Sequence, residues 1–132
     1  MEIESAAFHS AVVLGPHRWE KSPRLSGLGA YANRIRNACL AISAHCEENH
    51  SLTSLAADAR MSSFYFARVF AGLVGEPPHR YLLRTRLRRA ARMLHDGARV
   101  TEAAVKSGFS DVGHFSKTFQ RRYGVSPSRY PS

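Results

Sequence analysis

The stretch GFSDVGHFSKTFQRRYGVSPSRY, residues 108–130, decides the fold of this chain. It begins with a turn, continues as a short basic helix, and ends at a glycine and a proline-led final turn. Part of it repeats an earlier stretch at a constant spacing of 49 residues. The repeated residues are Phe66, Phe70, Gly75, Pro78, Arg80 and Tyr81, which recur as Phe115, Phe119, Gly124, Pro127, Arg129 and Tyr130. A period near 50 residues indicates a duplicated unit, so we expect one helical module to occur twice.

The charge of the chain is concentrated in the half that carries the repeat. Residues 1–50 hold five Lys/Arg and five Asp/Glu, whereas residues 51–132 hold 14 and five, which accounts for the whole net charge of +9. The hydrophobic fraction of 44% in 132 residues suits one ordinary packed domain or two very small ones. This uneven charge favours a polyanionic partner, which is DNA, RNA or an anionic membrane surface.

The cysteines and the first residues favour a cytoplasmic protein. Cys39 and Cys46 lie seven residues apart in a helical pattern. At about 1.5 Å per residue they are too far apart along one helix for a disulfide, which suits a reducing cytosol. The acidic start lacks the basic leader of a secretion signal, and no run approaches the roughly 20 apolar residues of a membrane span.

Two segments precede the repeat. Residues 1–29 are expected to form an irregular leader, because Gly and Pro interrupt every longer pattern. A helix is expected from Ala30 to about Asn49, because apolar residues follow a three-four spacing there. The cluster of His45, Cys46 and His50 suggests zinc. However, neighbouring helix positions point in different directions and no second ligand pair follows, so we expect no metal site.

Each copy of the repeat predicts two short helices that meet at a tight turn, which is a helix-turn-helix pattern. In the first copy, Thr53 or Ser51 caps one helix and Ser62 or Ser63 caps the next. The second of these helices buries Phe66, Val69, Phe70 and Leu73, and Gly75 ends it. A long arginine-rich helix then runs from about Pro78 to His95.

The second copy has the same order of elements. We expect Thr101 to cap a short helix and Ser110 or Asp111 to cap the following one. Upstream of the turn the spacing between the copies is 48 rather than 49, so one residue has been gained between turn and helix.

At this point the sequence closely resembles the DNA-binding domain of the AraC/XylS family of bacterial transcription regulators. The residues that carry the resemblance are Gly108-Phe109-Ser110, Phe115-Ser116-Lys117-Thr118-Phe119, Gly124-Val125-Ser126-Pro127 and Tyr130, with Leu55-Ala56-Ala59, Phe70, Gly75, Pro78 and Tyr81 in the earlier copy. The resemblance covers about residues 30–132. It implies an all-α, homeodomain-like fold of about seven helices. Two helix-turn-helix subdomains, residues 30–77 and 97–132, would be joined by a linker helix at 78–96.

The resemblance also implies a function. The second helix of each unit would enter a major groove, with the two grooves on one face of double-stranded DNA and about 34 Å apart. One chain would bind as a monomer and recruit RNA polymerase as a promoter-proximal activator, although nothing in the residues separates an activator from a repressor. Because about 30 leading residues cannot form the sensing barrel of many members, we expect no ligand-sensing domain in this chain, which is then a stand-alone regulator, a shortened relative or a fragment.

The exposed faces of the second helices supply the candidate DNA-binding residues. Arg68 is the best base-recognising candidate, because a guanidinium can bond guanine O6 and N7 together, and a phosphate contact is its alternative. Phe64 can contact a thymine methyl or a sugar. Because Val112 and Gly113 lack the polar groups usual in the family, we expect the first unit to specify sequence and the second mainly to add affinity. The candidates are Ser63, Phe64, Ala67, Arg68, Gly113, Ser116, Lys117, Gln120 and Arg121.

Two other functions compete with sequence-specific regulation. One is a non-specific or architectural DNA-binding protein, which the missing side chain at Gly113 favours. The other is a regulator with a methyl-accepting cysteine, but no basic or metal setting is evident that would lower the pKa of Cys39 or Cys46. The acids occur singly, and no phosphate-binding glycine loop or nucleophile elbow is present. We therefore expect no catalytic residues and no cofactor.

Overall fold

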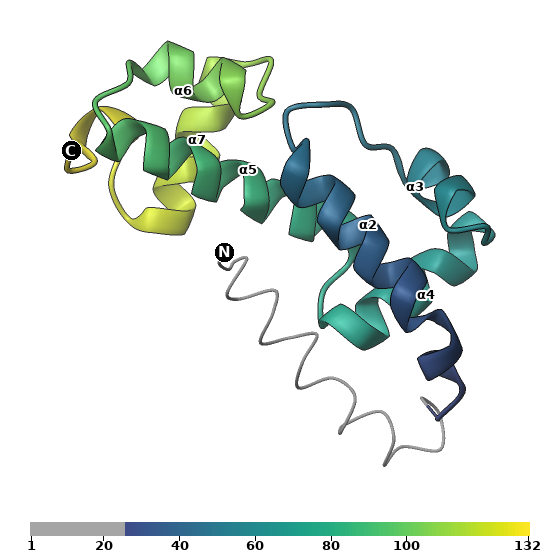
Figure 1. The fold of residues 1–132 in the computed structure, drawn as a ribbon. Helices are drawn as coiled ribbons and strands as arrows, with labels where there is room; N and C mark the ends of the chain where they lie inside the picture. The colour runs from purple at the N-terminus through teal and green to yellow at the C-terminus, as the bar shows by residue number, and fades with distance from the viewer. Residues whose placement is uncertain (1–25) are drawn as a thin grey trace. The chain divides into compact units, whose positions relative to one another are not determined.

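The computed structural model describes residues 26–132, and all regular elements in that range are helical (Figure 1). This confirms the all-α prediction. The described residues form six α-helices and two short 3-10 helices, where about seven helices were expected. The elements are η1 (Ser26–Tyr31), α2 (Ala32–Ala44), α3 (Leu52–Asp58), α4 (Ser63–Val74), α5 (Pro78–His95), α6 (Val100–Lys106), α7 (Val112–Tyr123) and η2 (Pro127–Arg129). The expected leader lies outside the described residues except for its last four, which belong to η1.

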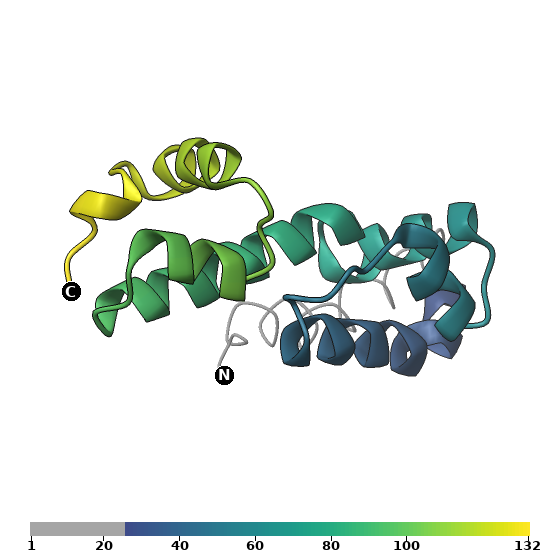
Figure 2. The same cartoon turned by 90° about the horizontal axis from the view of Figure 1, so that it is seen from above.

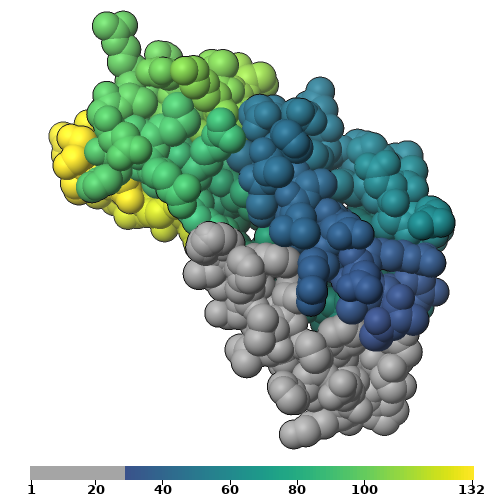
Figure 3. All heavy atoms as spheres, viewed as in Figure 1, coloured from purple at the N-terminus to yellow at the C-terminus, as the bar shows by residue number. Residues whose placement is uncertain are grey.

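The described chain divides into two compact units. Unit 1 comprises residues 26–44 and 50–82, and unit 2 comprises residues 45–49 and 83–132. In unit 1, α3 packs on α4, and α2 contacts both α4 and η1 (Figure 2). The atoms of η1 and α2 form much of the face of unit 1 that the space-filling view shows (Figure 3). In unit 2, α6 packs on α7 and η2 contacts the same helix.

The repeat in the sequence corresponds to the same ring contacts in both cores. In unit 1 the ring of Phe70 lies 5.7 Å from those of Phe66 and Tyr81. In unit 2 the equivalent ring, Phe119, lies 5.5 Å from Phe115 and 5.3 Å from Tyr130. All four phenylalanines are fully buried, as the spacing of apolar residues predicts.

Short polar side chains and glycines determine where most helices begin and end. The Ser51 hydroxyl accepts from Ser54 N at 3.0 Å and the Ser62 hydroxyl from Tyr65 N at 3.2 Å. A carboxylate oxygen of Asp111 accepts from Gly113 N at 2.8 Å and from His114 N at 3.3 Å. These contacts select Ser51, Ser62 and Asp111 from the alternatives left open by the sequence.

Two predicted helix boundaries are wrong. The first helix, α2, ends at Ala44 rather than near Asn49, so Cys46 lies beyond it and not on the same helix as Cys39. Thr101 does not cap α6, because that helix already begins at Val100, and the residue at the cap position, Arg99, makes no side-chain capping bond. Val100 packs against the core of unit 2, so the first residue of α6 is held by apolar packing and not by a capping hydroxyl.

No helix in residues 26–132 combines the length and apolar character needed to cross a membrane. The longest, α5, has 18 residues and carries arginines along its whole length.

Candidate nucleic-acid interface

Helix α4 has one buried face and one open face. Phe66, Val69 and Phe70 are at most 1% exposed, which anchors the helix in unit 1. On the opposite side Phe64 is 71% exposed and Arg68 is also exposed, whereas Ser63 and Ala67 are half-buried. The structure therefore places all four first-unit candidates outside the fully buried core.

The two exposed side chains of this face contact each other. Residues 64 and 68 are four apart and so lie one helical turn apart on the same side. The Arg68 guanidinium carbon lies over the Phe64 ring, 5.6 Å from its centroid, which is a cation–π contact. The sequence places the two residues on one face, but the stacking depends on side-chain rotamers that periodicity does not predict.

Helix α7 presents the second-unit candidates. Gly113, Lys117, Gln120 and Arg121 are exposed and Ser116 is half-buried. Val112, the first residue of the helix, packs partly against the core of unit 2. Since Val112 faces the core and Gly113 has no side chain, the first turn of α7 offers no polar side chain at these two positions.

The starts of the two helices also differ in charge. A neutral hydroxyl, that of Ser62, caps α4, whereas the carboxylate of Asp111 caps α7. The N-terminus of a helix attracts anions such as phosphate through its N–H groups and its dipole. A carboxylate that already accepts from Gly113 N and His114 N opposes a second anion there. The electrostatic setting of α4 therefore favours a phosphate more than that of α7.

Two arginines of α5 make contacts within unit 2: Arg86 is half-buried, whereas Arg89 is exposed. Arg86 donates from Nε to Cys46 O at 2.6 Å and from Nη2 to Glu48 O at 2.7 Å. Arg89 Nη1 lies 3.4 Å from a carboxylate oxygen of Glu47. Burial lowers the pKa of the Arg86 guanidinium, which nevertheless stays charged. The sequence does not reveal this role, because the acceptors are backbone carbonyls 40 and 38 residues away.

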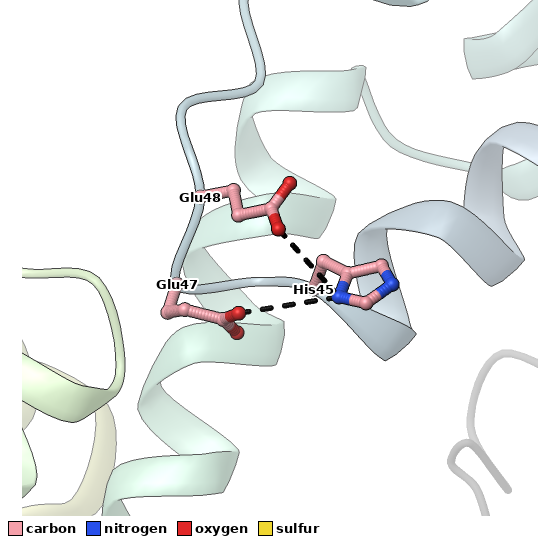
Figure 4. Close-up of side chains that lie close together, drawn as sticks. All are labelled: His45, Glu47 and Glu48. Carbon is pink, nitrogen blue, oxygen red and sulfur yellow. Dashed lines mark ion pairs between the residues drawn. The ribbon is translucent and has the colours of Figure 1, made fainter.

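A small group of possible metal ligands lies on the segment that Arg86 holds. His45 Nδ1 is 3.7 Å from a carboxylate oxygen of Glu48 and 4.0 Å from one of Glu47 (Figure 4). All three residues are exposed. Of the cluster that the sequence suggests, Cys46 is buried and only His45 belongs to this group. Because Arg89 also pairs with Glu47, the geometry is that of a surface ion-pair network.

The two cysteines of the sequence are buried, and no disulfide joins them. Burial raises the pKa of the Cys46 thiol, and the nearby Arg89 guanidinium acts in the opposite direction without cancelling the effect. A nucleophilic cysteine requires an accessible thiolate. The environment of Cys46 disfavours both access and the thiolate, which weighs against a methyl-accepting role for this residue.

Comparison with known proteins identifies the family. A protein-family model described as a helix-turn-helix domain matches residues 55–132, more than half of the chain. A solved probable AraC family transcriptional regulator from Rhodopseudomonas palustris CGA009 is similar with a TM-score of 0.67 and 32% identity, covering 74% of this chain and 94% of that one. The chain belongs to the AraC/XylS family of transcription regulators.

Two other similar proteins extend the comparison. The DNA-binding domain of AdpA, solved in complex with a target DNA, gives a TM-score of 0.70 at 31% identity, covering 73% of this chain and 87% of that one. The transcriptional regulator AlkR of Acinetobacter baylyi is 33% identical over 132 aligned residues, which cover 97% of this chain and 40% of AlkR. The chain thus spans about two fifths or less of the length of these curated relatives.

Proposed function

We propose that this chain is a sequence-specific regulator of transcription that binds double-stranded DNA through α4 and α7. The observation that carries the proposal is the open face of α4 in a member of the AraC/XylS family, where Arg68 is exposed beside Phe64. The net charge of +9 supports a polyanionic partner. The solved complex of the similar AdpA domain with a target DNA supports the same partner.

The finer parts of the proposal concern how DNA binding affects transcription. The activator RhaS of Escherichia coli O139:H28 is 48% identical over 54 residues, which cover 40% of this chain and 19% of RhaS. This similarity supports an activator, and we propose that it acts from a promoter-proximal site by contacting RNA polymerase. We further propose that one chain binds two adjacent major grooves as a monomer, because each helix-turn-helix pattern supplies its own recognition helix.

Selection of bound duplexes from a random pool tests this function. A sequence-specific regulator enriches a defined motif over successive rounds. A chain that binds DNA without enriching any motif is the non-specific or architectural protein, and that outcome rejects the proposal. The selection should be run near physiological salt, because binding through phosphates alone weakens steeply there.

Arg68→Ala is expected to reduce affinity for the selected duplex by about 1–3 kcal/mol and to relax the preference at few positions. The reason is loss of a bidentate contact to a guanine. Lys117→Ala, at the equivalent position of α7, should weaken binding by a similar factor on all sequences. It should also reduce, by about one, the slope of log binding constant against log salt concentration. Titrations of both variants on the selected duplex and on single-base substitutions distinguish the two effects.

The titrations of these two variants also test which unit specifies sequence. We propose that unit 1 specifies sequence and unit 2 mainly adds affinity, since Val112 and Gly113 offer no polar side chain at the start of α7. If Lys117→Ala relaxes base preference more than Arg68→Ala does, the proposal that unit 1 specifies sequence is wrong.

A further inference from the structure

Phe64 has an exposure that packing within unit 1 does not explain. It is 71% exposed, the highest value among the large hydrophobic residues of the described chain that lie at the surface. Single exposed apolar residues are common in proteins. Phe64 differs because it lies on the face that α4 turns away from the core and because an arginine stacks on its ring. Two independent features thus point to a ligand that meets this ring and this guanidinium together.

The two side chains can reach neighbouring base pairs because they converge. Their helix positions lie about 6 Å apart along the axis, which is nearly two steps of the roughly 3.4 Å between successive base pairs, but the cation–π contact holds the Arg68 guanidinium over the Phe64 ring. Contact with the ring limits the orientations of the guanidinium before DNA arrives, which reduces the entropy lost when Arg68 binds. An Arg68 held in this way can bond O6 and N7 of a guanine while Phe64 lies over an adjacent step.

The chemistry of a phenyl ring restricts what it recognises in the major groove. It has no donor or acceptor for the polar edges of the bases. The apolar group on those edges is the methyl at C5 of thymine. 5-Methylcytosine carries the same methyl at the same position, whereas cytosine and uracil lack it.

We infer that Phe64 and Arg68 form a single recognition element for a guanine next to a C5-methylated pyrimidine. This inference rests on the proposed function and specifies the bases that α4 recognises. Both thymine and 5-methylcytosine offer the C5-methyl group that the Phe64 ring contacts. Binding at this position therefore depends on the C5-methyl group rather than on the identity of the pyrimidine. Unit 2 has no equivalent element, because Gly113 occupies the position that corresponds to Phe64.

The experiment compares four duplexes that differ at one pyrimidine of the selected motif. This pyrimidine lies next to the guanine for which the preference is lost in Arg68→Ala. The pyrimidine is thymine, uracil, cytosine or 5-methylcytosine, with the matching purine opposite. Burying one methyl group is worth about a fourfold change in affinity. The wild-type chain should therefore bind the uracil duplex about three- to fivefold more weakly than the thymine duplex, and 5-methylcytosine should be favoured over cytosine by a similar factor.

Three variants separate the contributions of the pair. Phe64→Ala should bind the methylated and unmethylated duplexes equally, with its thermal midpoint unchanged because Phe64 is exposed. Phe64→Leu should retain the methyl preference but lose part of the guanine preference, because leucine offers no π face to Arg68. Tyr65→Ala removes an exposed aromatic residue that contacts Tyr31, at 5.5 Å between ring centroids, and should retain both preferences.

The outcomes distinguish this inference from the proposed function. A pool that yields no motif rejects the function itself. If a motif appears and Arg68 determines one of its guanines, the function stands, and equal wild-type binding to the thymine and uracil duplexes overturns the inference. A methyl preference that persists in Phe64→Ala overturns it as well, as does a motif with no thymine beside that guanine.

Discussion

Replacing Phe119 by alanine is expected to destabilise unit 2 by about 3–5 kcal/mol. The side chain is fully buried, and its ring centroid lies 4.6 Å from Tyr123, 5.3 Å from Tyr130 and 5.5 Å from Phe115. The substitution removes this ring and leaves a cavity in the hydrophobic core of unit 2. Since whole domains are stable by only about 5–15 kcal/mol, the variant should populate an unfolded form of α6 and α7 measurably.

Urea denaturation followed by circular dichroism gives the loss of stability, and hydrogen exchange shows which amides lose protection. The matched variant is Phe70→Ala, which removes the equivalent ring of unit 1 and two ring contacts instead of three. Phe64→Ala controls for the loss of a phenyl ring from an exposed position and should change stability by less than about 0.5 kcal/mol. A loss below about 1.5 kcal/mol for Phe119→Ala would show that the aromatic cluster does not hold unit 2 together.

The features that the sequence predicts well depend on neighbouring residues. Buried phenylalanines follow from helical spacing, and the N-cap at Ser62 follows from a hydroxyl placed before an apolar run. Gly75 and Gly124 adopt positive φ at the ends of α4 and α7, as expected for glycines that stop helices. Each of these signals acts over a few residues, so the chain displays it without its tertiary structure.

The predictions that failed depend on contacts between distant residues. The predicted end of α2 lies too late in the chain. Arg86 holds residues 45–49 through hydrogen bonds to backbone carbonyls, and because every residue has such a carbonyl, the sequence does not identify these acceptors. Local spacing favours a capping hydroxyl at Thr101, because it does not reveal the tertiary contact by which Val100 packs against the core. At the candidate interface, periodicity predicts that Phe64 and Arg68 share an open face, but their stacking follows from rotamers, and their contacts with DNA stay a prediction.

Replacing Gly108 by alanine is expected to destabilise unit 2 by about 2–4 kcal/mol. Gly108 has a φ of 102°, where an L side chain costs about 1–2 kcal/mol. An added Cβ would also lie 2.6 Å from Arg86 Nε and 2.9 Å from Cys46 O. Arg86 cannot move aside freely, because its Nε donates to that same carbonyl. The expected result is therefore a loss of stability that exceeds the backbone term alone, measured by urea denaturation.

The equivalent turn of unit 1 supplies the control for this prediction. Met61 N bonds Ala56 O and Arg60 N bonds Ala57 O, the same pattern that Phe109 N and Gly108 N make with Ala104 O and Val105 O. Arg60 has a φ of 58° without being glycine, so this turn tolerates a side chain at the cost of backbone strain.

Arg60→Gly should therefore stabilise unit 1 slightly, by up to about 1 kcal/mol, because relief of the strain exceeds the added flexibility of the unfolded chain. Arg86→Ala supplies the second test. It should be destabilising alone, because it leaves Cys46 O and Glu48 O without their donor. Combined with Gly108→Ala, it should cost less than the sum of the two single changes, because the added Cβ no longer meets the guanidinium. Strict additivity would show that the strain at Gly108 comes from the backbone alone and that Arg86 takes no part in it.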